Sequence, residues 1–193
     1  EMCIRDRFIP IVERHAQTQS VTDFSVPSEG YGQFLVDVFH EWYAHDVGKI
    51  YVSQFDNLLG QWLGYPSTTC VHQPTCGQSL VAEANGDVYA CDHFVYPEYK
   101  VGNLTQQPLT EIVLSSRQQQ FGLEKSQKLT ALCRRCEFRK LCYGGCTKHR
   151  FISLENEPNP HNYLCASYRY FFEQTAPYMQ AMARQIRLHP SAA

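Results

Sequence analysis

The chain has 193 residues, of which 44% are hydrophobic, and its formal net charge is -2 at pH 7. This length can bury one substantial core or two small ones, so we expect a soluble globular protein. The near-neutral charge argues against nucleic acid as the main partner, and no apolar run approaches the roughly 18 residues of a membrane span, which argues against a membrane protein.

The first seven residues show neither helical periodicity nor a capping residue. We interpret residues 1 to 7 as a truncation edge or foreign sequence, and we assign no role to Cys3.

Residues 8 to 65 contain no cysteine and alternate between two kinds of apolar pattern. We expect strands at Phe8–Val12 and Ile50–Phe55 because both runs are short and apolar. Helical spacing predicts a helix from about Tyr31 to Val47 and a second one around Leu58–Leu63. This order predicts an α/β fold with a parallel sheet, and so few units indicate the end of a larger domain.

Residues beyond Pro66 are rich in loops. Asn85-Gly86 lies between two short β-type runs and predicts a β-hairpin with a type I′ turn. A helix is expected from Pro108 to near Gly122. A last helical pattern runs over residues 163 to 188 with a break or kink at Pro177, and its aromatic and methionine stripe is typical of a core-facing surface.

The second half of the chain holds eight of the nine cysteines, which is enough for two sets of four. Four thiolates bind one [4Fe-4S] cluster or one structural zinc ion. The cysteines are Cys70, Cys76, Cys91, Cys133, Cys136, Cys142, Cys146 and Cys165.

Three kinds of site compete for these cysteines. Disulfides usually occur in small secreted domains, and no signal peptide precedes them here. A zinc ribbon would supply a second C-x2-C pair beside Cys133 and Cys136, but the next pair is Cys142-x3-Cys146. Iron-sulfur clusters accept ligands at irregular spacings, so we favour them. Basic residues lie among the last cysteines, and we interpret them as a solvated face rather than an RNA site: Arg134, Arg135, Arg139, Lys140, Lys148, His149 and Arg150.

The spacing Cys70-x5-Cys76-x14-Cys91, followed by the C-x2-C-x5-C-x3-C run and a final Cys165, resembles the SPASM domain of radical S-adenosylmethionine (SAM) enzymes. Within that group it is most similar to the anaerobic sulfatase-maturating enzymes. The resemblance covers about residues 66 to 170. It implies that residues 8 to 65 are the last β/α units of a partial radical SAM barrel, with residues 171 to 193 as a C-terminal helix and tail.

The same resemblance implies the ligands of two auxiliary [4Fe-4S] clusters. Cluster I would be held by Cys70, Cys76, Cys91 and Cys146. Cluster II would be held by Cys133, Cys136, Cys142 and Cys165. Gly144 and Gly145 would permit the backbone reversal that brings Cys146 to the first set.

Asp92 directly follows Cys91 and, by resemblance, occupies the position of an acidic residue that deprotonates the substrate. In that chemistry a 5′-deoxyadenosyl radical takes hydrogen from Cβ of a seryl or cysteinyl residue, which becomes formylglycine. Without the resemblance, an Asp at a hairpin exit reads as a turn residue. His72 and His93 are interpreted as bystanders or as residues that support the cysteines.

The C-x3-C-x2-C motif that binds the catalytic cluster and SAM is absent from these residues. We therefore expect the C-terminal portion of a cytoplasmic enzyme that needs SAM and a third [4Fe-4S] cluster. Its expected partners are a sulfatase polypeptide and an electron donor such as flavodoxin or ferredoxin. Two alternatives stay open: another SPASM peptide maturase, and a non-catalytic iron-sulfur or zinc module.

Overall fold

The computed structural model describes residues 8–189, which fall into two compact units. The helical unit comprises the described residues up to Thr69, together with Lys140–Cys142 and those from Tyr163 onward. The cysteine-rich unit comprises Cys70–Arg139 and Tyr143–Asn162. Each unit has its own elements, and we describe them in turn.

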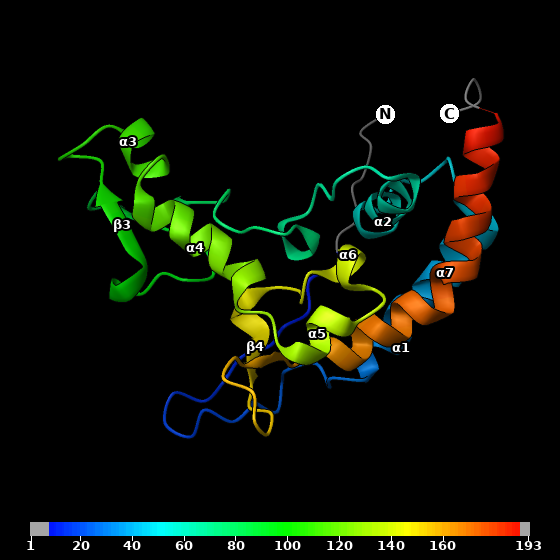
Figure 1. Ribbon diagram of the computed structural model, residues 1–193, viewed down its shortest axis with the longest axis horizontal. Coiled ribbons are helices and arrows are strands. Elements are labelled where there is room, and N and C mark those ends of the chain that lie inside the picture. Colours follow the sequence, from blue (N-terminus) through cyan, green and yellow to red (C-terminus); the bar gives the residue numbers. More distant parts are fainter. Residues whose placement is uncertain (1–7, 190–193) are drawn as a thin grey trace. The chain divides into compact units, whose positions relative to one another are not determined.

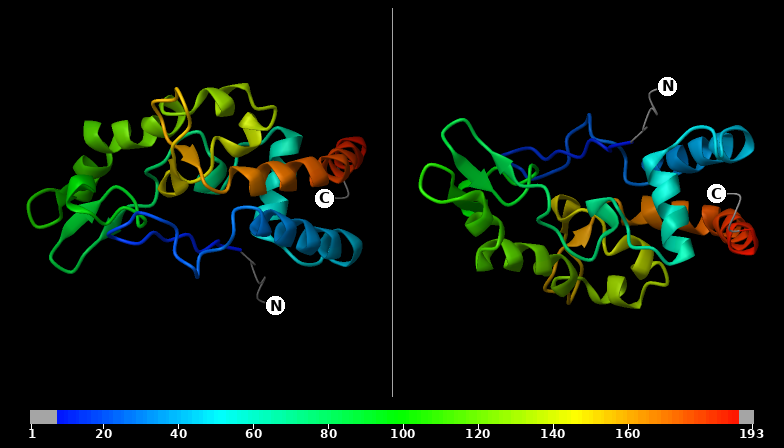
Figure 2. Two further views of the ribbon diagram at one scale, coloured as in Figure 1. Left: turned by 90° about the horizontal axis from the view of Figure 1, so that it is seen from below. Right: turned by 90° about the horizontal axis from the view of Figure 1, so that it is seen from above.

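Three helices build the helical unit: α1 (Gly30–His45), α2 (Ser53–Leu63) and α7 (Cys165–Leu188). Helices α1 and α7 lie side by side, as both Figure 1 and Figure 2 show. Their shared core is aromatic: the ring centroids of Phe39 and Phe55 lie 5.4 Å apart, and Phe39 also contacts Phe171. All three rings are fully buried, so this cluster contributes most of the apolar area that holds the helices together.

A glycine allows α1 and α7 to approach closely. A Cβ added to Gly32 would lie 2.7 Å from the Cα of Ser167, and the Gly32 N–H donates to the Ser167 hydroxyl at 2.9 Å. The Ser167 hydroxyl in turn donates to the carbonyl of Ser28. Any larger residue at position 32 would push the two helices apart.

Neither strand predicted in this part of the chain is formed. Ser53–Phe55 are the first residues of α2, because Val52 ends the extended segment and the Asp56 carboxylate accepts from its N–H at 2.9 Å. Residues 11 to 14 run antiparallel to residues 21 to 26 through loop hydrogen bonds and the single bridge Arg14↔Val21. All strand pairs among the described residues are antiparallel, so the expected parallel layer is absent from them.

The predicted helices of this unit are confirmed, with α1 beginning and ending within two residues of the expected bounds. Helix α7 continues through Pro177 without a break in assignment. Its predicted stripe is buried and lies in the core: Leu164, Tyr168, Phe171, Phe172, Met179 and Met182.

A three-stranded antiparallel sheet forms one part of the cysteine-rich unit, in the order β1 (Val81–Ala82), β2 (Asp87–Tyr89) and β3 (Lys100–Asn103). The hairpin at Asn85-Gly86 is confirmed, but its type I′ turn is wrong. Gly86 has φ of +85°, whereas Asn85 is not among the residues with positive φ. The Gly86 N–H donates to the Glu83 carbonyl, so the loop is a three-residue type with glycine in the left-handed position.

The helix expected over residues 108 to 122 is instead two helices, α3 (Leu109–Val113) and α4 (Ser116–Gln127). The Ser115 hydroxyl accepts from the N–H of Gln118 and caps α4 anew, a signal that the apolar periodicity did not reveal. The remaining elements are α5 (Ala131–Arg135), α6 (Arg139–Cys142) and the paired strands β4 (Arg150–Ile152) and β5 (His161–Asn162).

The combination of helices and small sheets confirms a mixed α/β class. Among residues 8–189, no helix is both long and apolar enough to cross a membrane. The division of the chain at residues 65 and 170 stays a prediction.

Candidate metal centre

Cys70 and Cys76 flank the loop that leads into the cysteine-rich unit, and α4 fixes both of them. Cys70 begins a short 3-10 helix, and the ammonium of Lys125 donates to its carbonyl. The Cys76 N–H donates to the Gly122 carbonyl at 3.1 Å. A Cβ on Gly122 would lie 2.7 Å from the Cys76 carbonyl oxygen, so only glycine admits this approach.

Cys91 follows the end of β2, at the exit of the predicted hairpin. The Ala90 N–H donates to the Tyr99 carbonyl, and Gln118 donates its side-chain amide to the Ala90 carbonyl at 3.1 Å. The thiol of Cys91 donates to the Asp92 carboxylate at 3.1 Å, and Asp92 itself is exposed. The carboxylate predicted to be functional therefore lies directly against a predicted ligand sulfur.

Cys146 is reached through three consecutive residues in the left-handed region: Tyr143, Gly144 and Gly145 have φ of 47°, 72° and 64°. The predicted reversal at the two glycines is confirmed. Arg150 locks this turn, because its guanidinium donates to the carbonyls of Tyr143 and Gly144. These contacts fix the chain direction just before Cys146.

The structure brings the four predicted ligands of cluster I into one neighbourhood. The thiols of Cys70, Cys76 and Cys146 interact with one another electrostatically, and Cys91 interacts with Cys146. The Thr147 hydroxyl also hydrogen-bonds the Cys76 sulfur. Segments separated by more than 50 residues thus meet as the resemblance implied.

Burial makes these thiols reluctant to ionise. It raises the pKa of Cys91 to about 12, with Asp92 adding to the effect, and it raises the pKa of Cys146 to about 11. Burial raises the pKa of Cys76 as well. Bound iron supplies the positive charge that a buried thiolate needs, so a metal centre fits this donor set.

Backbone donors already face two of the sulfurs. The N–H groups of His93 and Lys148, each two residues after a cysteine, hydrogen-bond Cys91 and Cys146 and lower their pKa values against the effect of burial. Such N–H donors to sulfur also surround iron-sulfur clusters, where they tune the reduction potential.

The eight cysteines after residue 69 form no disulfide. Among residues 8–189, no group of three or more His, Cys, Asp or Glu side chains is arranged to hold a single metal ion. A cubane differs from a single ion, because each of its four irons takes one cysteine.

The second predicted quartet is divided between the two units. Cys133 lies in α5, where the Thr130 hydroxyl accepts from its N–H, and His161 Nδ1 lies 3.8 Å from its sulfur. Cys136 belongs to the same unit, whereas Cys142 and Cys165 belong to the helical unit. Their grouping as ligands of cluster II stays a prediction.

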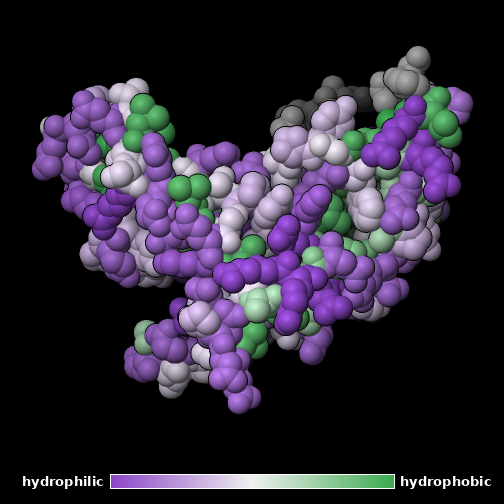
Figure 3. Space-filling view, in the orientation of Figure 1, coloured by the Kyte–Doolittle hydropathy of each residue, from purple (hydrophilic) through white to green (hydrophobic). Residues whose placement is uncertain are grey.

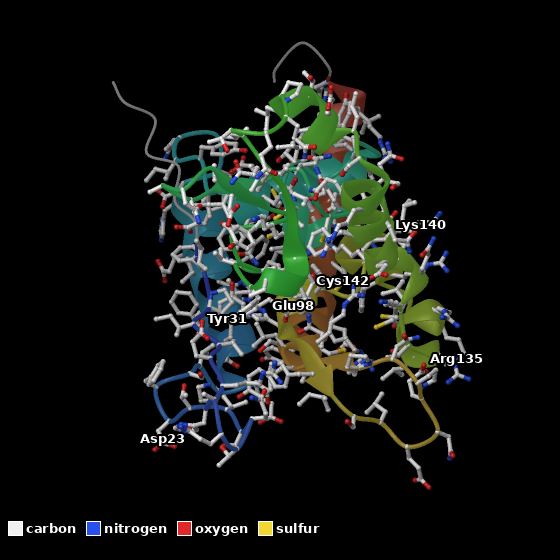
Figure 4. The ribbon with its side chains drawn as sticks, turned by 90° about the vertical axis from the view of Figure 1, so that its left-hand side faces the viewer. Asp23, Tyr31, Glu98, Arg135, Lys140 and Cys142 are labelled. Carbon is white, nitrogen blue, oxygen red and sulfur yellow. The ribbon has the colours of Figure 1, made fainter. Side chains whose placement is uncertain are left out.

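The basic residues separate into two kinds. Arg134, Arg135, Arg139 and Lys140 are exposed, as predicted, and Arg135 projects outward from α5 in Figure 4. The surface over α5 is correspondingly hydrophilic in Figure 3. His149 is buried, and burial lowers its pKa to about 4, so it does not belong to a solvated face. Arg150 is likewise structural.

Two residues beside the cysteines were not predicted as parts of the site. Lys125 has 0% exposure and contacts the Cys70 loop, and Gln118 bridges the Gly77 and Ala90 carbonyls. Neither carries a sequence signal, because polar residues on a polar helix read as solvated. Of the histidines, His93 Nδ1 lies 3.5 Å from the Cys146 sulfur, and His72 is buried.

Cys3 lies outside the described residues.

Comparison with known proteins gives a consistent picture. Residues 70–137 match the SPASM iron-sulfur cluster-binding domain. The chain is 41% identical to a serine-type anaerobic sulfatase-maturating enzyme of Bacteroides thetaiotaomicron, over 95% of this chain and 48% of that protein. It is 30% identical to a cysteine-type enzyme of Clostridium perfringens, over 94% of this chain and 49% of that protein.

Solved structures agree with the sequence comparison. The structure of native anSMEcpe with bound AdoMet and Kp18Cys peptide matches with a TM-score of 0.74 and 30% identity, covering 93% of this chain and 48% of that one. The chain thus spans about half the length of the curated relatives it matches. It carries a SPASM iron-sulfur cluster-binding domain and is a homologue of the anaerobic sulfatase-maturating enzymes.

Proposed function

We propose that this chain supplies the auxiliary-cluster portion of a radical SAM enzyme that converts a seryl or cysteinyl residue of a sulfatase into formylglycine. The observation that carries the proposal is the meeting of Cys70, Cys76, Cys91 and Cys146, with the Asp92 carboxylate 3.1 Å from one of their sulfurs. The relatives named above, which act as sulfatase-maturating enzymes, support the choice of reaction.

Each cluster would be a [4Fe-4S] cubane. Cys70, Cys76, Cys91 and Cys146 would hold cluster I, and Cys133, Cys136, Cys142 and Cys165 would hold cluster II. When bound, such clusters accept and pass on electrons. SAM and a third cluster require the C-x3-C-x2-C motif, which these residues do not contain.

Asp92 would serve as the general base. Conversion of a CH2–OH or CH2–SH group to the aldehyde stage removes hydrogen from Cβ and a proton from the hydroxyl or thiol. The Asp92 side chain is exposed and can meet a peptide, while its position beside Cys91 keeps proton removal next to the site of electron transfer.

Exposed polar groups beside Asp92 could orient the peptide. The Lys148 ammonium donates to the Tyr96 hydroxyl at 3.2 Å and to the His93 carbonyl at 3.5 Å. Lys148 also lies 5.4 Å from the centre of the Tyr96 ring, so the two side chains hold each other in place. The substrate would be an unfolded sulfatase segment, the electron donor a flavodoxin or ferredoxin, and the compartment the cytoplasm.

The test replaces Asp92 with Asn, which keeps the size and hydrogen bonding of the side chain but cannot accept a proton. This chain would be assayed together with a segment that supplies C-x3-C-x2-C, either its own upstream sequence or that of the Bacteroides relative. Asp92→Asn should bind iron and cleave SAM normally but form at least about 100-fold less formylglycine per 5′-deoxyadenosine. Mass spectrometry of a sulfatase-derived peptide measures this ratio.

Glu98→Gln is the matched control, because Glu98 is an exposed carboxylate six residues farther along the same loop. It should leave the ratio unchanged. Near wild-type coupling in Asp92→Asn would remove Asp92 from the mechanism, and a cross-linked product without an aldehyde would replace the proposed reaction by another peptide modification.

A further inference from the structure

Lys125 on α4 is buried beside the predicted ligands of cluster I without an acidic partner among its printed contacts. Its side chain has 0% exposure. Its ammonium donates to the carbonyls of Cys70 and Val71, the second at 3.0 Å. Lysine is almost never fully buried unless a negative charge compensates it, because moving an ammonium out of water is costly.

Two neutral carbonyls satisfy the hydrogen bonds of this ammonium but not its charge. The negative groups that interact with Lys125 are the sulfurs of Cys76, Cys146 and Cys70, and the only other charged group is the cationic Arg150. The Lys125 carbonyl accepts from the Arg150 guanidinium at 2.7 Å, which fixes the backbone of α4 to the turn before Cys146. The charge of Lys125 is therefore compensated only when these sulfurs carry negative charge.

We propose that Lys125 is the fixed counter-charge of cluster I, which raises the reduction potential of that cluster and holds the Cys70 loop in place. This inference rests on the proposed ligand set. A cubane with four thiolates is anionic and becomes more so on reduction. A buried ammonium beside it stabilises the reduced form most, because Coulomb interactions are strong where water is excluded.

This role assigns cluster I, rather than cluster II, as the better electron acceptor of the pair. Cys91 and Asp92 belong to the same neighbourhood, so the cation would favour electron uptake beside the proposed base. Lys125 is thus a positioning and tuning residue, since it does not touch the substrate site.

The test uses the full chain, reconstituted anaerobically, with three variants at position 125. Lys125→Met and Lys125→Gln remove the charge, while Lys125→Arg keeps it. Lys128→Met is the matched control, because Lys128 follows the same helix but is exposed and pairs with Glu124. Iron content and the midpoint potential of each cluster would be measured, with cluster I assigned as the signal that Cys91→Ala removes.

Both neutral variants should shift the potential of cluster I to more negative values by similar amounts, while cluster II, Lys125→Arg and Lys128→Met stay close to wild type. Loss of cluster I in the two neutral variants but not in Lys125→Arg would also support the proposal. Unchanged potentials in the neutral variants, or equal shifts or losses in all three, would overturn it. A wild-type chain that takes up no iron would instead refute the ligand set itself.

Discussion

Gly122 offers a sharp test of how α4 positions the first ligand set. In Gly122→Ala the new Cβ would lie 2.7 Å from the Cys76 carbonyl oxygen, a backbone atom that cannot rotate away. Helix α4 or the Cys76 loop must therefore move by several tenths of an ångström. The movement also strains the hydrogen bond from the Cys76 N–H to the Gly122 carbonyl.

The magnitude follows from three opposing effects. Overpacking typically costs about 1–3 kcal/mol, and a weakened hydrogen bond costs about 1 kcal/mol. Replacing a helical glycine by alanine returns up to about 1 kcal/mol of helix propensity. Gly122→Ala should therefore destabilise the cysteine-rich unit by about 1–3 kcal/mol and reduce iron binding at cluster I.

Gly60 in α2 is the matched control, since nothing lies within 4 Å of a Cβ added there. Gly60→Ala should be neutral or stabilising by up to about 1 kcal/mol. Urea unfolding of the iron-free protein, followed by circular dichroism, measures both variants. If Gly122→Ala stabilises the protein as much as Gly60→Ala does, the close approach of α4 to the Cys76 loop is wrong.

Other predictions concern the clusters and the helical unit. Cys146→Ala should remove one cluster signal and Cys165→Ala the other, and loss of the same signal in both would refute the two quartets. Removal of iron by a chelator should raise the protease sensitivity of the cysteine-rich unit, whereas equal digestion rates with and without iron would deny the clusters a folding role. Burial raises the pKa of Tyr31 to about 12 from 10.0, so the unfolded chain loses this proton first and stability falls as pH rises through that window. Tyr31→Phe should lessen the fall, and should cost about 0.5–1.5 kcal/mol at neutral pH by losing the bond from the hydroxyl to the Phe8 carbonyl; an unchanged alkaline profile would contradict the assignment.

Helices with a continuous apolar stripe were the elements that the sequence predicted best. Helices α1 and α7 each bury a long stripe, so local periodicity and tertiary packing agree. The two predicted strands failed because short apolar runs fit several structures. Residues 53 to 55 fit α2 because Val52 and Asp56 form a local cap, and that hydrogen bond outweighs the β-propensity of the run.

The candidate site was predictable where covalent chemistry dictates the residue type. Cysteine spacing identified all four residues that meet near cluster I, because few other functions require so many thiols. Lys125 and Gln118 could not be found in this way. Their role depends on which face of α4 meets the Cys70 and Cys76 loop, and a polar helix carries no hydrophobic pattern that reveals that face.

The central claim is that this chain binds two iron-sulfur clusters through its eight cysteines after residue 69. Iron and sulfide analysis of the anaerobically reconstituted protein, together with Mössbauer spectroscopy, tests it most directly. We predict about eight irons per chain, four in each of two cubanes. Stoichiometric zinc without iron absorption in anaerobically purified protein would contradict the account.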